Sequence, residues 1–173
     1  ALADLFGLRA TVLDPAPLEL AEARRLGLET VSGLVEQYEP EGRQFDVVVM
    51  CQTVDHLRDI AGTLRAIRGL IHPHGVFFID IVDLRAALLR AWSVEEAIKI
   101  DHPYYLTQAT METFLEQAGF AMMRADYAVD HLHVGYLCRP ADPAPEARPP
   151  AASVARLFDD VRLVRNAPRP VAS

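Results

Sequence analysis

The sequence predicts an α/β fold with helices on both faces of a doubly wound, mostly parallel sheet. Two apolar segments, 46–50 (DVVVM) and 76–81 (VFFIDI), lack regular polar alternation, which is typical of strands buried on both faces of a parallel sheet. An amphipathic helical segment lies between them, and short strands and helices alternate along the rest of the chain. Short connections between alternating strands and helices favour a layered α/β domain.

Composition predicts an ordinary globular protein that acts on small molecules. The 173 residues are 51% hydrophobic and 24% charged, and the net charge of −7 leaves no basic footprint for nucleic acid or an anionic membrane. No apolar run approaches the roughly 20 residues that span a bilayer. The two cysteines lie in apolar segments without metal-ligand spacing, so we expect a reducing, cytoplasmic location.

The first elements are short. Residues 10–13 form an apolar strand that Asp14-Pro15 ends, and residues 18–26 form a helix with acidic residues early and arginines late, as the helix dipole favours. Thr30 and Val31 begin another strand, and a polar loop covers 36–44. This segment therefore predicts a strand–helix–strand unit.

The central segment predicts a second unit of the same kind. The strand at 46–50 is followed by a helix from about Leu57, then a turn at 72–75 (HPHG), where Pro and Gly stop the helix, then the strand at 76–81. One apolar stripe of helical period runs along the helix. Its members are Leu57, Ile60, Leu64, Ile67 and Ile71.

The remaining elements complete the domain. We expect a helix over 85–97, a loop rich in aromatic and ionisable residues, and a helix with Thr110 as N-cap that ends at Gly119. Residues 121–129 and 132–138 predict an antiparallel pair of strands. The predicted organisation is a domain over 1–139, a Pro/Ala-rich linker over 140–152 and a tail over 153–173 that holds a short helix.

Four sequence motifs, in this order and spacing, resemble class I S-adenosylmethionine-dependent methyltransferases. They are VLDPAP, FDVVVMCQTVDHLRD, LIHPHGVFFIDI and IDHPYYLTQATMETFLEQAGF. The likeness covers about residues 3–140 and is closest to the small-molecule branch, with sugar C-methyltransferases and ubiquinone-biosynthesis-type enzymes. It implies a Rossmann-like, seven-stranded sheet, mostly parallel with an antiparallel last strand.

The resemblance implies a cofactor site for S-adenosylmethionine. Asp14 matches the acidic residue that binds the ribose hydroxyls, since a carboxylate accepts two hydrogen bonds from a cis-diol, although a helix N-cap or turn aspartate is the alternative. Gly33 and Leu34 stand where the family contacts adenine, through backbone and apolar contacts here. Cys51 and Gln52 match positions that line the methionine portion, but for Cys51 we favour a plain core position.

The acceptor side is predicted at two histidines. His56 matches a histidine past the fourth strand of the family and could orient the substrate or act as a general base, or be satisfied by backbone at a helix N-terminus. His102 lies where the family's acceptor segment packs over the cleft. With Asp101, Tyr104 and Tyr105 it would form one wall of a substrate pocket, unless these aromatics serve packing alone.

Other polar residues are interpreted as structural. Asp55 is expected to cap the helix after it, and Asp80 and Asp83 have either a supporting role near the cleft or a capping role. Four more histidines are interpreted as surface residues, namely His72, His74, His131 and His133. No metal site is predicted.

The glycine-rich GxGxG loop that opens this family, after its first strand, has no counterpart in these 173 residues. We therefore expect the chain to be the N-terminally incomplete, C-terminal portion of a methyltransferase that acts on a small-molecule acceptor, with the first strand of the sheet missing. A shortened sheet in which the second and fourth strands pair directly is an alternative. Two other functions stay open: a degenerate, non-catalytic interaction domain, and a nicotinamide-binding Rossmann oxidoreductase.

Overall fold

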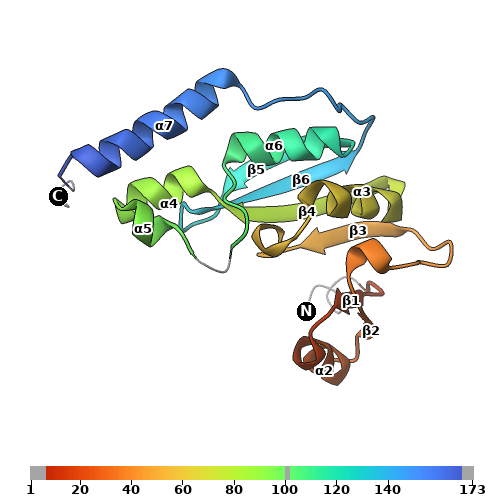
Figure 1. Cartoon of the computed structure of the whole chain (residues 1–173). Coiled ribbons are helices and arrows are strands. Elements are labelled where there is room, and N and C mark those ends of the chain that lie inside the picture. The colour runs from red at the N-terminus through yellow and green to blue at the C-terminus, as the bar shows by residue number, and fades with distance from the viewer. Residues whose placement is uncertain (1–6, 100–101, 169–173) are drawn as a thin grey trace. The chain divides into compact units, whose positions relative to one another are not determined.

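A computed structural model describes residues 7–99 and 102–168 of the chain (Figure 1). The chain divides into two compact units, 1–42 and 43–173. Each unit has its own sheet, so the described strands form two sheets where the sequence predicted one sheet of seven strands. The units are therefore described one at a time.

The first unit is a small strand–helix–strand motif. Strand β1 (Thr11–Asp14) and strand β2 (Glu29–Ser32) pair in parallel, and helix α2 (Pro17–Arg25) connects them. A short 3₁₀ helix, η1 (Val35–Gln37), follows. Pro17 at the first helical position, an early glutamate and two late arginines agree with helix-end preferences, and the elements predicted here are confirmed.

The second unit has a four-stranded mixed sheet in the order β3-β4-β6-β5. Strands β3 (Phe45–Met50) and β4 (Ile71–Val82) are parallel. Strand β6 (His133–Pro140) runs antiparallel to both β4 and β5 (Phe120–Tyr127). The two parallel strands and the antiparallel closing pair are as the sequence predicted.

Five α-helices are described in the second unit. They are α3 (Ile60–Leu70), α4 (Leu84–Ala91), α5 (Val94–Ala97), α6 (Gln108–Gln117) and α7 (Ala151–Asn166). The single helix predicted over 85–97 is broken, because Trp92 takes the left-handed conformation (φ 53°) that ends α4. Thr107, and not Thr110, is the N-cap of α6; the two threonines form a reciprocal capping box.

The sheet of the second unit buries one face more completely than the other. Along β4 and β6, fully buried residues alternate with half-buried ones. The buried set is Phe77, Ile79, Ile81, Val134, Tyr136 and Cys138. Helices α3 and α6 pack against each other, and Figure 1 shows them on the same side of this sheet. Within this unit the two faces of the sheet therefore differ in burial.

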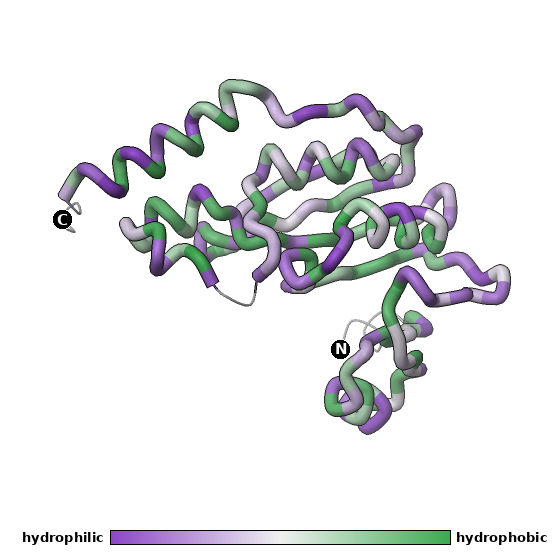
Figure 2. Tube along the Cα trace, viewed as in Figure 1, coloured by the Kyte–Doolittle hydropathy of each residue, from purple (hydrophilic) through white to green (hydrophobic). Residues whose placement is uncertain are grey.

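Strand β3 departs furthest from its predicted burial. It is a continuous hydrophobic segment in Figure 2, but Val47 is 48% exposed and Val49 is 56% exposed. The two residues are two positions apart and so lie on one face of an edge strand. The apolar run correctly identified a strand, whereas the prediction that both of its faces are buried is wrong for this structure.

The predicted turn at 72–75 lies inside β4. Phe45 pairs with Ile71 and Val47 pairs with Val76, so the HPHG segment forms an irregularity between two paired stretches. A Cβ on Gly75 would lie 2.8–2.9 Å from the Ile71 side chain and from the backbone oxygens of Phe45 and Asp46. Glycine is required here because only a residue without a side chain allows this close approach.

Helix α7 belongs to the second unit, although the sequence predicted a tail there. Arg85 on α4 forms an ion pair with Asp160, and the Trp92 indole nitrogen donates a hydrogen bond to the Ala167 carbonyl oxygen, at 3.2 Å. Val164 is 7% exposed. The helix begins at Ala151, inside the predicted linker. Among the residues that the structure describes, no helix has both the length and the apolar character needed to cross a membrane.

Candidate active site

The predicted site residue His56 lies shortly after strand β3, beside Asp55. Asp55 and His56 lie on a 3₁₀ helix, η2 (Val54–His56), which the fully buried Val54 anchors to the core. The helix after it is capped by another residue: Asp59 accepts a hydrogen bond from the Gly62 backbone nitrogen at 2.8 Å. The prediction that Asp55 caps this helix is therefore wrong, and its carboxylate is available for another contact.

His102 comes from the loop between α5 and α6. Hydrogen bonds hold the part of this loop after His102: the Tyr104 hydroxyl donates to the Arg58 carbonyl at 2.8 Å, and the Leu84 backbone nitrogen donates to the Leu106 carbonyl at 2.8 Å. Leu106 is 5% exposed, and Thr107 caps the next helix. The loop therefore holds His102 against the carboxyl end of β4.

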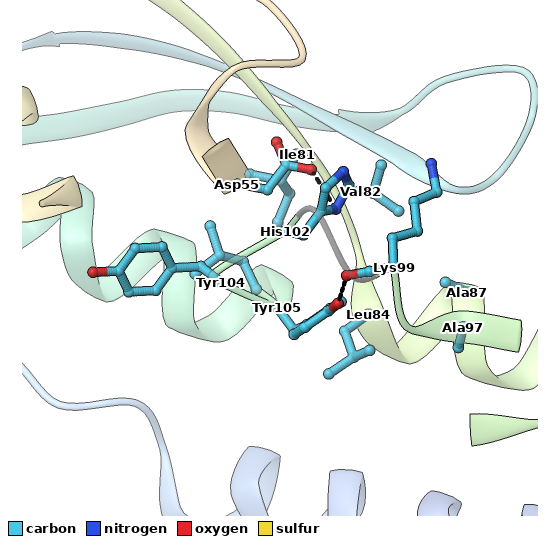
Figure 3. Close-up of a pocket in the computed structure, with 11 residues that line it drawn as sticks. Asp55, Ile81, Val82, Leu84, Ala87, Ala97, Lys99, His102, Tyr104 and Tyr105 are labelled. Atoms are coloured by element: carbon cyan, nitrogen blue, oxygen red, sulfur yellow. Dashed lines mark hydrogen bonds and ion pairs between the residues drawn. The ribbon is translucent and has the colours of Figure 1, made fainter. Parts of the chain in front are cut away.

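The structure brings His102, Asp55 and His56 together. The His102 Nδ1 atom lies 3.0 Å from the Asp55 Oδ2 atom, and the two side chains are 11% and 13% exposed (Figure 3). The His56 ring meets the His102 ring edge to face, with the ring centroids 4.5 Å apart. His56 itself is exposed. A carboxylate that is mostly removed from water and pairs with an imidazole fixes the orientation of the ring.

A small, open pocket adjoins this group. Its apolar lining comes from Ile81, Val82, Leu84, Ala87, Ala97 and Leu106. Its polar lining comes from Asp55, Lys99, His102, Tyr104 and Tyr105. Apolar walls with a few convergent polar groups are typical of sites for organic ligands.

Tyr104 and Tyr105, which the sequence predicted on the acceptor side, line this pocket, but their hydroxyls are engaged by the backbone. The Tyr105 hydroxyl donates to the Lys99 carbonyl oxygen, and that of Tyr104 donates to Arg58 as described above. Their rings therefore shape the pocket, while their hydroxyls hold the loop. Asp101, which the sequence also placed on this wall, lies outside the described residues.

The segment after β3 is held by Asp80. The Gln52 backbone nitrogen donates to the Asp80 Oδ1 atom at 2.6 Å, and Gln52 has a left-handed backbone (φ 49°). Cys51 is exposed, which contradicts the core position favoured from the sequence. Partial burial and the nearby Asp80 charge raise the pKa of the Cys51 thiol. Asp80 therefore supports the backbone at Cys51 and Gln52, the positions predicted to line the methionine portion of the cofactor, and does not cap a helix.

Asp83 has the capping role that the sequence allowed. It is 3% exposed, its Oδ1 atom accepts from the Arg85 backbone nitrogen at 3.3 Å, and its Oδ2 atom accepts from the Tyr127 hydroxyl at 2.7 Å. Burial, followed by the hydrogen bond to Asp83, raises the pKa of Tyr127 to about 12. This pair joins the start of α4 to the end of β5.

In the first unit, Asp14, Gly33 and Leu34 lie at the carboxyl ends of the paired strands. The Asp14 Oδ1 atom accepts from the Ala16 backbone nitrogen at 2.7 Å, and the Gly33 backbone nitrogen donates to the Asp14 carbonyl oxygen at 3.2 Å. The N-cap of α2 is Ala16, so Asp14 stabilises the turn and does not cap the helix. Gly33 borders open space, since an added Cβ would meet nothing within 4 Å.

The histidines interpreted as surface residues lie away from this pocket's lining. His72 and His74 lie in the irregular part of β4, and their rings are 5.6 Å apart. His133 pairs with Asp130 at 2.5 Å, and hydrogen bonds from the Leu132 and His133 backbone nitrogens hold the pKa of Asp130 well below its usual range. Sequence reasoning missed Lys99 and the contact of Asp55 with His102, because neither has a motif of its own.

The sequence is similar to known methyltransferases. A family described as "Methyltransferase domain" matches residues 3–125. The chain is 32% identical over 78 residues to a ubiquinone biosynthesis O-methyltransferase of Methylocella silvestris, and the match covers 42% of this chain and 30% of that enzyme. The matched segment thus spans about a third of that relative.

Solved methyltransferases have the same fold. The CcbJ methyltransferase of Streptomyces caelestis superposes with a TM-score of 0.65 at 15% identity, over 82% of this chain and 78% of that one. The magnesium protoporphyrin IX methyltransferase of Synechocystis, with bound S-adenosylhomocysteine, superposes with a TM-score of 0.62 at 11% identity, over 76% and 64%. Because the family model matches most of the residues, the chain belongs to the methyltransferase domain family.

Proposed function

We propose that the protein transfers a methyl group from S-adenosylmethionine to a small-molecule acceptor bound in the pocket beside His102. The observation that carries this proposal is the pairing of His102 with Asp55 at the edge of a pocket within a methyltransferase domain. The mostly apolar walls of the pocket, with a few polar groups, suit an organic acceptor.

The residues expected to hold the cofactor fit it in each unit. In the first unit, Asp14 has one carboxylate oxygen engaged by Ala16, which leaves the other for a ribose hydroxyl, and Gly33 borders open space that could hold an adenine ring. In the second unit, Cys51 and Gln52 are exposed at the end of β3. The cofactor supplies a methyl group on a sulfonium, and these residues would bind and orient it.

We infer that the acceptor carries a hydroxyl group. If Nδ1 of His102 holds a proton and donates it to Asp55, Nε2 has its lone pair free to accept the proton of a hydroxyl under attack. His56, whose ring contacts that of His102, would orient the acceptor. The ubiquinone biosynthesis relative is an O-methyltransferase by name, which supports a hydroxyl over a carbon or nitrogen acceptor.

We further propose that the chain is the C-terminal portion of the enzyme, and that a glycine-rich strand–loop segment upstream completes the sheet and the cofactor site. The proposal rests on the missing GxGxG motif and on the exposed residues of the edge strand β3. An edge strand leaves backbone donors and acceptors unpaired, which a further strand would satisfy.

Calorimetry with S-adenosylmethionine tests both statements. The protein extended upstream through such a loop should bind the cofactor, while these 173 residues should bind it weakly or not at all. Tight binding by the 173 residues alone would contradict the incomplete-site proposal. A longer protein that neither binds the cofactor nor forms S-adenosylhomocysteine with hydroxylated acceptors would contradict the enzymatic one.

A further inference from the structure

We propose that Asp55, His56 and His102 form a binding site for one divalent transition-metal ion, a site that the sequence did not predict. The inference deepens the proposed function, on whose pocket it rests, because a metal ion there would contact the acceptor. Each of the three residues offers one ligand atom, and these atoms all lie within 4.8 Å of one another. Among the residues that the structure describes, these three form the group of His, Cys, Asp and Glu side chains whose ligand atoms lie this close together.

The spacing suits a metal ion. Typical metal–ligand distances for histidine nitrogen and carboxylate oxygen are about 2.0–2.2 Å. The His102 Nδ1 and Asp55 Oδ2 atoms are 3.0 Å apart, so an ion at such distances from both would see them at about 90°, the angle between neighbouring ligands of an octahedron. The exposed His56 ring, at 4.5 Å from the His102 ring, needs only a side-chain rotation to complete one face.

The ligand types select the class of ion. Two imidazoles and one carboxylate form the facial set that binds divalent iron and related transition metals with open positions, whereas magnesium and calcium favour oxygen ligands. The positions not filled by protein would face the pocket that Asp55 and His102 line. An ion bound by His102 Nδ1 and Asp55 would take the place of the proton between them. It would polarise an acceptor oxygen, so that the ion, in place of the His102 imidazole, would favour loss of the acceptor proton.

The segments that carry two of the ligands are held in place by burial and hydrogen bonds. Asp55 follows the buried Val54, and hydrogen bonds to Arg58 and Leu84 hold residues 104–106, which follow His102. A shared proton between Asp55 and His102 involves only two of the three residues. Nor do the chain's other histidine contacts described here match this set: the close pair His72 and His74 sits in a bulge, and His133 pairs with a single aspartate.

Cobalt(II) is a suitable probe because its visible absorption reports the coordination geometry. The 173-residue chain, without S-adenosylmethionine or acceptor, should bind one Co²⁺, by both absorption and calorimetry. Removing a supporting partner of a ligand typically weakens metal binding about 10- to 100-fold, so Asp55→Ala, His56→Ala and His102→Ala should each weaken it at least about tenfold. The double variant His72→Ala/His74→Ala removes two imidazoles, as many as the proposed site contains, from another close pair of histidines. It should bind Co²⁺ like the parent.

Absence of saturable Co²⁺ binding by the parent chain would overturn the proposal. So would loss of binding in the His72/His74 variant together with its retention in the His102 variant. Circular dichroism checks that each variant is folded, and Asp55→Asn and His102→Gln replace any alanine variant that is not. Since no cofactor is present, a negative result here leaves methyl transfer standing, and failure of cofactor binding leaves the metal site standing.

Discussion

The two units of this chain differ in how much core they have. Of the described residues that are apolar and buried, only Leu20 and Ala23 lie in the first unit. The second unit holds the others, including Phe77, Phe120 and Tyr136. A parallel pair of strands with one helix buries little apolar surface and is marginal by itself, whereas four strands with several packed helices can be stable.

Because of this difference, part of the expected cofactor site lies outside the unit that is expected to be the more stable. The proposed ribose and adenine contacts lie in the unit with the smaller core, while the proposed acceptor pocket with His102 lies in the unit with the larger one. We expect the second unit to keep its structure when the first is perturbed. The following predictions test that separation, from the largest expected effect to the smallest.

Matched alanine substitutions in the two cores should have unequal effects on urea unfolding followed by the fluorescence of Trp92. This residue is the single tryptophan and lies in the second unit. Phe77→Ala should lower the free energy of unfolding by about 3–5 kcal/mol, because it leaves a cavity in the larger core. Leu20→Ala removes a residue that is 1% exposed, yet the Trp92 transition in urea should hardly move. Equal shifts for both variants would mean that the units unfold as one block.

Substitutions at the predicted site residues should separate cofactor binding from chemistry in the longer enzyme proposed above. Asp14→Ala should raise KM for S-adenosylmethionine, because the ribose loses a hydrogen-bond acceptor. His102→Ala should lower kcat by about 10²-fold or more, the usual contribution of a positioned base. Initial rates of S-adenosylhomocysteine formation measure both, and His74→Ala, outside the pocket lining, is the control. A loss of kcat in that control equal to that of His102→Ala would contradict the site.

The sequence predicted secondary structure better than it predicted burial and contacts. The strands at 45–50 and 120–140 follow from hydrophobic runs and turn residues, which are local signals. The exposure of Val47 depends on what lies beside an edge strand, which no local pattern records. The pairing of Asp55 with His102 joins residues 47 positions apart in sequence, so spacing alone could not predict it.

Two tyrosines on neighbouring strands should respond oppositely to loss of their hydroxyls. Tyr127→Phe removes a hydrogen bond to the buried Asp83 and should cost about 1–3 kcal/mol of unfolding free energy, since the buried carboxylate would lose a hydrogen-bond donor. The Tyr136 hydroxyl is buried with no hydrogen-bond partner in the described structure, so Tyr136→Phe should be neutral or stabilising. Urea denaturation of both variants measures the difference. A Tyr127→Phe protein as stable as the parent would show that the hydrogen bond from Tyr127 to Asp83 does not stabilise the fold.

The Tyr127 pair also predicts a pH dependence. Because burial raises the pKa of Tyr127 to about 12 from a usual value of about 10, its contribution is fully present below pH 10 and is lost as pH rises toward 12. The stability difference between the parent chain and Tyr127→Phe should therefore narrow between pH 9 and pH 12. A difference that stays constant across this range would contradict the assigned environment of the phenol.

The smallest expected effect concerns helix α7 and the extent of the second unit. Asp160→Asn weakens the ion pair with Arg85, whose side chain is 39% exposed, so the loss should be below about 1 kcal/mol. It should nevertheless loosen α7 enough to shift Trp92 emission to the red, because the indole hydrogen bond to Ala167 depends on the docked helix. Asp159→Asn changes the neighbouring charge but affects only an exposed pair with Arg162 inside α7, so its emission should match the parent. Equal emission from all three proteins would show that the ion pair does not hold the helix, and that α7 docks through apolar contacts such as those of Val164.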